Sequence, residues 1–307
     1  MRRLVGVVLL AAGAFFIVLA PLVKFVVADK LIQAPADQYT ITELRAENAQ
    51  YFSTQDLKVL TGTLDITVTT RGDVKEAKDD HVVWDQFTSA SDVTNGRPGI
   101  SMTEFRSAFN KYDGVGVNCC GANVDSEPVQ LEGQIYLFPF GVEQKTYKVF
   151  NSSTRKAYDA VFAGEDTIEG LQVYKFVQQV PPTVVQSLNV PASVLSMTAE
   201  TGDVAADRVY DGTNTFWVEP KTGAPVKQEQ QRHEVLKTKD GVERMPAFVA
   251  TAVMTPETVT GLAKTVRDNL SQITLITITL PLVSLILGVA LVLGGIVLLR
   301  VPSSREA

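Results

Sequence analysis

The chain has 307 residues, of which 45% are hydrophobic, and a formal net charge of −6 with only two histidines and two cysteines. This acidic balance argues against binding to nucleic acid and against adhesion to anionic lipid headgroups. The length allows one large domain or two small ones, and the longest apolar runs lie close to the two ends.

Two segments without a charged side chain, residues 4–23 and 273–299, stand out from the rest of the chain. Each can cross a hydrocarbon core of roughly 30 Å as a helix, which takes about 20 residues. We therefore predict two transmembrane helices with the domain 24–272 between them. The alternative for the first segment is a signal peptide cleaved near Ala28, although twenty apolar residues exceed the usual apolar stretch of about 7–15.

Arginines flank both apolar segments on the sides that point toward the chain ends. Basic residues beside a span are retained in the cytoplasm. We therefore predict a plasma-membrane protein whose residues 1–3 and 300–307 are cytoplasmic and whose residues 24–272 are extracytoplasmic. The two ends carry four arginines against one glutamate, a net +3, so the exported residues carry −9.

Glycines recur seven residues apart in both predicted spans, at Gly6 and Gly13 and at Gly288 and Gly295. Each pair lies near one helix face, where small residues allow close helix packing. The spans are therefore candidates to pack on each other or on other envelope membrane proteins. The alternative is that glycine is simply common in membrane helices.

The domain between the spans is patterned mainly as strands. Alternation of apolar and polar residues, β-branched runs and a Pro-Lys-Thr-Gly turn predict strands at 64–69, 82–84, 134–138, 171–177, 215–219 and 226–236. Short helices are predicted at 103–112 and 187–197. A longer helix is expected from Thr255-Pro256-Glu257, since Thr is a good N-cap and Pro suits the first helical position; it continues into the second span as a stalk.

These patterns predict an α+β fold: a strand-rich antiparallel exported domain flanked by N- and C-terminal transmembrane helices. Aromatic residues cluster within 136–150, 162–176 and at 216–217. Such clusters fit a packed core, and they also fit an elongated sheet that curls around an apolar cavity. The sequence leaves both open.

Residues that carry catalysis are scarce, and the sequence contains no nucleophile elbow, zinc-protease helix, phosphate loop or dinucleotide-binding loop. We therefore predict no enzyme, no cofactor and no metal. Asp79-Asp80-His81 is interpreted as a solvated turn rather than a metal site. The carboxylates of Asp85, Asp113 and Asp211 leave a carbohydrate-active enzyme as a remote alternative.

The only cysteines, Cys119 and Cys120, are adjacent. Exported domains often oxidise their thiols, which favours a vicinal disulfide slightly over two free thiols. Consecutive Cα atoms are about 3.8 Å apart, below the usual disulfide spacing, so such a bond would be strained and reducible. A redox switch is disfavoured because no basic group lies nearby in the sequence.

Two motifs resemble a known family. They are the segment Gly-Gln-Ile-Tyr-Leu-Phe-Pro-Phe-Gly at 133–141, followed by Lys-Thr-Tyr at 145–147 and by Phe150, and the segment Phe-Trp-Val-Glu-Pro-Lys-Thr-Gly-Ala at 216–224. Together with the two terminal spans they resemble the actinobacterial PorA porin family, over essentially the whole chain. The resemblance implies an envelope protein that handles lipid or lipoglycan, and it implies no catalytic residue.

A strand porin needs a lipid-facing apolar band on alternate residues of many strands, whereas here helices supply the anchoring. We therefore expect no pore, but a protein that binds or shuttles a lipid or lipid-linked glycan in envelope biogenesis. The alternative is a scaffold for an envelope glycosyltransferase or transporter. The predicted lipid-lining residues are Tyr136, Phe138, Phe140, Tyr147, Phe150, Phe216 and Val218.

Overall fold

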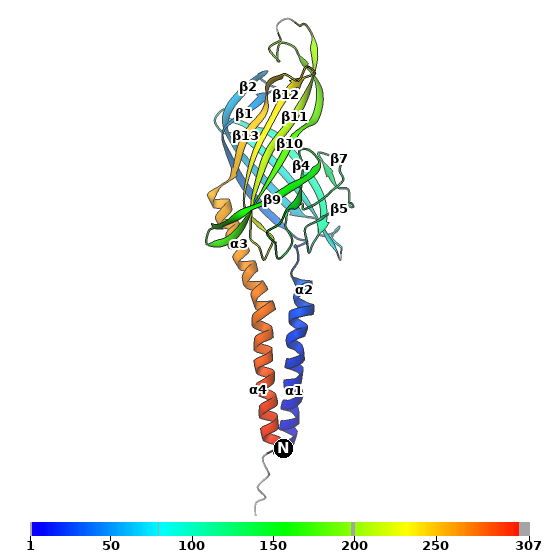
Figure 1. Cartoon of the computed structure of the whole chain (residues 1–307), viewed down its shortest axis with the longest axis vertical. Helices are drawn as coiled ribbons and strands as arrows, with labels where there is room; N and C mark the ends of the chain where they lie inside the picture. The colour runs from blue at the N-terminus through cyan, green and yellow to red at the C-terminus, as the bar shows by residue number, and fades with distance from the viewer. Residues whose placement is uncertain (1, 79, 198–199, 301–307) are drawn as a thin grey trace, which may run out of the picture. The chain divides into compact units, whose positions relative to one another are not determined.

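The computed structural model describes residues 2–78, 80–197 and 200–300. They form two compact units, residues 34–266 in one and the residues on either side of that range in the other. The predicted cytoplasmic tail beyond Arg300, and Asp79 of the predicted polar turn, lie outside the described residues. Figure 1 labels most of the elements of both units.

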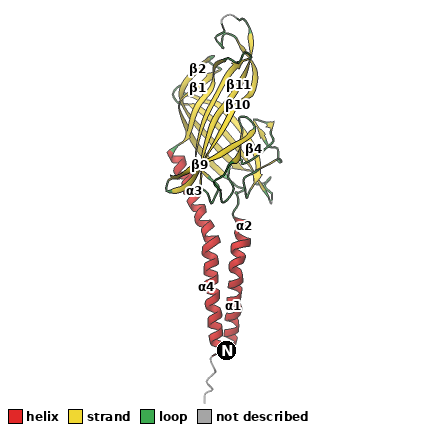
Figure 2. Cartoon of the chain, in the orientation of Figure 1, coloured by secondary structure: helices red, strands yellow, loops and turns green. Residues whose placement is uncertain are grey.

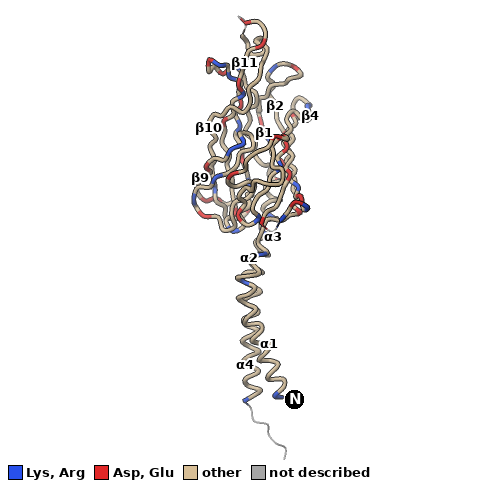
Figure 3. The backbone as a smooth tube through the Cα atoms, turned by 90° about the vertical axis from the view of Figure 1, so that its right-hand side faces the viewer, with Lys and Arg blue, Asp and Glu red and all other residues tan. Residues whose placement is uncertain are grey.

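Helices make up the unit formed by the two ends of the chain. They are α1 (Arg2–Leu22), the π-helical turn η1 (Val23–Val27), α2 (Ala28–Leu31), the end of α3 (Pro256–Thr274), the π-helical turn η2 (Leu275–Thr279) and α4 (Leu280–Arg300). The runs Arg2–Val27 and Pro256–Arg300 are both long and apolar enough to cross a membrane. Figure 3 shows that charged residues are sparse along α1 and α4 and frequent in the strands and loops.

Helix α3 begins where the sequence predicts a helix. Pro256 is its first residue, and the Thr255 hydroxyl accepts a hydrogen bond from the Thr258 amide at 3.3 Å. This side-chain cap satisfies one of the free amides of the first turn. The helix continues without interruption to Arg300, with the π-helical turn at Leu275–Thr279 on the way.

The described residues of the other unit form one antiparallel sheet of thirteen strands that curls on itself as a half-barrel (Figures 1 and 2). The order along the sheet is β7-β6-β4-β3-β2-β1-β13-β12-β11-β10-β9-β8, and β5 also pairs with β4. The strands are β1 (Tyr39–Ser53), β2 (Lys58–Gly72), β3 (His81–Asp92), β4 (Arg97–Asn110), β5 (Gly116–Val117), β6 (Asn123–Val124), β7 (Glu127–Pro128), β8 (Tyr147–Asn151), β9 (Lys156–Ile168), β10 (Leu171–Pro191), β11 (Asp203–Val218), β12 (Pro225–Thr238) and β13 (Glu243–Met254). The predicted strand-rich antiparallel fold is confirmed.

One irregular segment joins the two sides of the half-barrel. Gln134 forms a bridge to Val115 on the β4 side and a parallel bridge to Val149 in β8. Side chains reinforce this closure, because the rings of Phe105 in β4 and Phe150 in β8 stack with centroids 5.5 Å apart. The sheet is therefore closed at this level although its terminal strands do not pair with each other.

Three local predictions are wrong. Residues 103–112 lie mostly in β4, because Phe105 and Phe109, four apart, share a face in a strand as well as in a helix. Residues 187–191 extend β10, whose pairing with β9 stops at Gln178, so that beyond this point it is an edge strand and tolerates proline. Residues 134–138 form the closing segment just described and not a strand.

Candidate functional site

Four of the predicted lipid-lining residues lie in one buried aromatic cluster. Phe138, Tyr147, Phe216 and Val218 pack around Phe176, which is fully buried. The rings of Phe138 and Phe176 stack with centroids 4.8 Å apart, and Tyr147 contacts Phe138 edge-on at 5.5 Å. The motif segments 133–141 and 216–224 therefore meet in space, and their aromatic rings fill this part of the interior.

Two more predicted residues, Tyr136 and Phe150, belong to a second cluster with Trp84, Phe105 and Phe109. The Tyr136 ring stacks on Trp84 at 5.3 Å, and its hydroxyl accepts a hydrogen bond from Ser107 at 3.1 Å. Burial raises the pKa of Tyr136 above its usual range. The seventh predicted residue, Phe140, is only partly buried.

Polar side chains occupy the same face of the sheet as Phe176. Gln178 is fully buried; its amide donates to the Val149 carbonyl at 2.6 Å and accepts from Asn214 at 2.7 Å. Glu234 is 1% exposed and is held by the guanidinium groups of Arg208 and Arg232. A buried carboxylate needs such pairing, so the inner face combines apolar clusters with a hydrogen-bonded polar network, in which Asn214 Oδ1 is left without a partner among the described residues.

The opposite face of the sheet is polar and exposed. Along β2 and β3 the buried Leu64 and Trp84 alternate with Asp65 and Asp85, whose side chains are 48% and 50% exposed. A strand that faces lipid carries apolar residues at these outward positions. The outward face therefore suits water and not the hydrocarbon interior of a membrane.

An open pocket of about 570 Å³ lies on this outward face, over β10 to β13. His233 and Asp211 line it, with His233 Nδ1 2.9 Å from an Asp211 carboxylate oxygen. Asp85 pairs instead with Arg106 at 2.8 Å, and Asp113 accepts the Val115 amide of its own turn. The three carboxylates considered for glycosidase chemistry thus have separate local partners.

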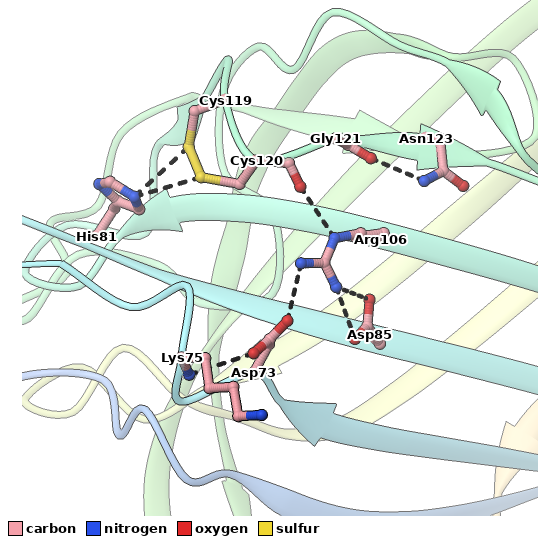
Figure 4. A network of polar contacts seen from close by, with 9 residues as sticks. All are labelled: Asp73, Lys75, His81, Asp85, Arg106, Cys119, Cys120, Gly121 and Asn123. Atoms are coloured by element: carbon pink, nitrogen blue, oxygen red, sulfur yellow. Dashed lines mark hydrogen bonds and ion pairs between the residues drawn. A yellow bond between two sulfur atoms is a disulfide. The ribbon is translucent and has the colours of Figure 1, made fainter.

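Cys119 and Cys120 form the predicted vicinal disulfide. Their loop is attached to β4 on both sides, because Gly116 and Val117 before it and Asn123 after it all pair with that strand. Arg106, in the middle of β4, donates from Nε to the Cys120 carbonyl at 2.9 Å (Figure 4). The sheet therefore holds the backbone of the cysteine loop in place.

Arg106 carries three interactions at once. Besides the Cys120 carbonyl, it contacts Asp73 at 2.9 Å and Asp85 at 2.8 Å. Partial burial lowers the pKa of Arg106, but the two carboxylates outweigh that effect and raise it overall. The same guanidinium lowers the pKa of Asp73.

His81, 38 residues before Cys119 in the chain, lies against the disulfide. Its Nε2 is 3.5 Å from each of the two sulfur atoms, and its Nδ1 is 2.7 Å from Asp80 Oδ1 (Figure 4). The side chain is only 11% exposed, and the hydrogen bond with His81 lowers the pKa of Asp80. Sequence reasoning missed this contact, since it predicted no basic group near the cysteines; the β3–β4 register creates it.

The helices α1 and α4 lie side by side, and four of their glycines, Gly6, Gly13, Gly288 and Gly295, are among the residues buried in the contact. A Cβ on Gly13 would lie 2.7 Å from the Gly288 carbonyl oxygen, and a Cβ on Gly295 would lie 2.8 Å from that of Gly6. Atoms of that kind do not approach so closely, so only glycine allows this spacing. Of the two interpretations that the sequence left open for these glycines, the structure supports the packing of the two apolar helices on each other.

A strand-rich domain joined to two helices of this length and polarity defines a protein associated with the membrane or cell envelope. The chain belongs to the family described as Porin PorA, whose model matches residues 5–297 and thus includes most of both helices. The predicted family resemblance is confirmed. The chain is also similar to Porin PorA of Corynebacterium amycolatum, with 27% identity over 138 residues that cover 36% of each chain.

These comparisons correct the predicted function. The family and the relative are both described as porins, whereas we expected a lipid-binding or lipid-shuttling protein without a pore. The expectation of no pore applies to porins that cross the membrane as a strand barrel. Neither the apolar helices nor the acidic charge of the domain excludes a pore of another kind.

Proposed function

We propose that this protein is a non-enzymatic pore-forming protein of the cell envelope, in which α1 and α4 cross the membrane. Membership of the Porin PorA family over residues 5–297 carries the proposal, because the matched region includes most of both apolar helices. The relative matches over only 36% of its length, so the pore activity of this chain rests on the family as a whole.

The helices are proposed as the membrane-crossing elements because the strands are poorly suited to lipid. The outward face of the sheet carries Asp65, Asp85 and Arg106, none of which is buried. A charged residue on the lipid face of a strand costs about 2–4 kcal/mol at the bilayer midplane. In α4, by contrast, Arg300 at the end is the only charged residue.

One copy of α1 and α4 leaves no path for water between the two helices. Their backbones meet at Gly13 and Gly288, where even an added Cβ would clash. We therefore propose that several copies of the chain assemble around a common channel. The apolar side chains exposed on α1 and α4, such as Leu4, Phe15, Ile286 and Leu293, would then contact membrane lipids or neighbouring copies.

The orientation follows from the positive-inside rule. Arg2 and Arg3 begin α1 and Arg300 ends α4, so we propose that both ends are cytoplasmic and that residues 34–266 lie outside the plasma membrane. Protease added to intact cells should then degrade this domain, whereas epitope tags at both chain ends should survive. Loss of either tag would contradict the orientation.

The pore itself is tested with the purified full chain in planar lipid bilayers. We expect discrete single-channel current steps. Chemical cross-linking of the purified chain in detergent should show species larger than one chain. The perturbing variant is Gly288→Ala, which would meet the Gly13 backbone, and its matched control is Gly294→Ala, where nothing lies within 4 Å of an added Cβ. The proposal is overturned if no current steps appear although the protein is inserted in membranes, as shown by flotation with liposomes, and is folded, as shown by a β-sheet circular-dichroism spectrum.

A further inference from the structure

The cysteine loop holds a second set of interacting groups, away from the apolar helices. His81 Nε2 and the two sulfur atoms come from β3 and from the loop after β5, and all three lie within 4.8 Å of one another. Thiolate sulfur together with imidazole nitrogen is the ligand set that zinc and other thiophilic cations prefer. In the structure the sulfurs are bonded to each other, so they are not available as thiolates.

We propose that reduction of the Cys119–Cys120 disulfide converts this group into a site for a thiophilic divalent cation such as Zn²⁺, with His81, Cys119 and Cys120 as ligands. This inference is independent of the pore. The oxidised pair binds no metal, and the reduced pair does.

The distances already match such a site. Zn²⁺ with Zn–S near 2.3 Å and Zn–N near 2.0–2.1 Å in tetrahedral geometry places a sulfur and a nitrogen ligand about 3.5 Å apart. His81 Nε2 lies 3.5 Å from both sulfurs. Only the separation of the two sulfurs must change, and breaking the bond between them allows that.

The imidazole is also oriented as a ligand. Asp80 Oδ1 lies 2.7 Å from Nδ1, and an acceptor at that position favours the tautomer with the proton on Nδ1, which leaves Nε2, facing the sulfurs, free to bind a cation. A carboxylate behind a metal-binding histidine is the usual outer partner of such ligands. The loop backbone is anchored by Arg106 through the Cys120 carbonyl and does not depend on the disulfide for that contact.

The chemistry balances with a dithiol as reductant. Two electrons and two protons pass to the Cys119–Cys120 bond, which becomes two thiols, while the two thiols of the reductant become a disulfide. Binding of the cation then releases the two thiol protons, since the ligands are thiolates. Three protein ligands leave the fourth tetrahedral position for water or another small ligand.

The test uses the full chain in detergent and Co²⁺ alone as a spectroscopic probe. The protein is reduced with a dithiol, freed of reductant without oxygen and shown by thiol titration to carry two thiols. We expect the reduced chain to bind one Co²⁺ with thiolate-to-cobalt absorption, and Zn²⁺ to displace it. The untreated disulfide form, which has the same sequence, should show no such absorption.

Variants separate a three-ligand site from simple thiol chemistry. His81→Gln should weaken binding at least about 100-fold, and Asp80→Asn about 10–100-fold, the range expected for an outer partner. His233→Gln is the matched control, because His233 pairs with Asp211 on the outward face, and it should bind as the wild type does. The proposal is overturned if the reduced chain binds no Co²⁺, or if His81→Gln binds it unchanged.

Discussion

The helices α1 and α4 contact each other most closely at glycines, which have no side chain, whereas the sheet is stabilised by its largest side chains, the aromatic rings of the interior. Gly13 and Gly288 bring the helix backbones into direct contact, and Phe138, Phe176 and Phe216 fill the half-barrel with rings. Lipid provides no hydrophobic drive between helices, so close backbone approach has to supply the attraction. In water, by contrast, the burial of apolar surface stabilises the packing by about 25 cal/mol per Å².

The difference predicts opposite responses to a change in side-chain size. The sheet should be sensitive to the removal of volume and the helix pair to its addition. Buried polar groups form a third case, because they are sensitive to the loss of a partner rather than of volume. Four experiments test this contrast.

The largest effect should come from the loss of a buried ring in the sheet. Phe176→Ala is expected to lower the free energy of unfolding by about 3–5 kcal/mol, because it leaves a cavity beside the rings of Phe138, Tyr147 and Phe162, which Phe176 contacts. Denaturant unfolding of the full chain in detergent, followed by tryptophan fluorescence, measures it. Phe87→Ala is the control, since Phe87 is 41% exposed and should change stability far less.

Glu234 tests the buried polar network of the inner face. Glu234→Gln should destabilise the chain by about 2–3 kcal/mol, because it weakens the charged hydrogen bonds from Arg208 and Arg232, and the loss of such bonds costs a free energy of this order. Glu229→Gln lies on the same strand but on the opposite face, and it should stay within about 0.5 kcal/mol. Equal effects of the two substitutions would show that the network does not stabilise the sheet.

The helix pair should respond to a single added methyl group. Gly288→Ala places a Cβ 2.8 Å from the Gly13 carbonyl oxygen and should weaken the pairing by about 1–3 kcal/mol. Spin labels on cysteines substituted for Leu4 and Val297, both exposed, report the helix separation, and the native disulfide leaves no other free thiol. A broader distance distribution is expected for Gly288→Ala but not for Gly294→Ala.

The smallest effect should come from the loss of a single buried hydrogen bond, between Tyr51 and Asp92, whose contribution to stability depends on pH. Burial raises the pKa of Asp92, but hydrogen bonds from Asn95 and Tyr51 outweigh burial and hold it below its ordinary value of 3.8. The carboxylate therefore stabilises the fold above that value, and the stabilisation is lost as the pH falls through the lower pKa of the folded protein.

Tyr51→Phe removes one of these bonds, 2.7 Å long, and should cost about 1 kcal/mol at neutral pH. The same residue shows the coupling from its own side, because burial and Asp92 raise the pKa of Tyr51 to about 12. Acid unfolding curves should be less steep for Tyr51→Phe than for the control Tyr39→Phe, whose side chain is exposed. Identical curves would contradict the assignment.

Local sequence patterns were sufficient to predict those elements whose structure is decided by residues close together in the chain. The apolar ends, the cap at Thr255-Pro256 and the hairpin around Pro220–Gly223 all appear as expected, because membrane length, helix capping and turn geometry are set by neighbouring residues. The helix predicted at 103–112 failed since a spacing of four also fits a strand, and pairing of β4 with β3 decided between them.

The aromatic motif residues show the limit most clearly. Their clustering in the sequence was compatible with a packed core and with a cavity, and only the placement of Phe138 against Phe176 showed that rings fill this region. The closing segment at Gln134 could likewise not be predicted from the sequence, because its bridges to Val115 and Val149 depend on segments that are distant in the chain.

By itself the sequence determined the two apolar helices, the strand-rich domain between them, the spacing of the glycines in both helices and the family. These features are encoded in composition and short-range periodicity, which do not depend on long-range contacts. Only the tertiary structure decided which residues meet: it brings His81 to Cys119 and Cys120 across 38 residues and seats Glu234 between two arginines. Such contacts arise from strand register, and register is settled by the packing of the whole sheet.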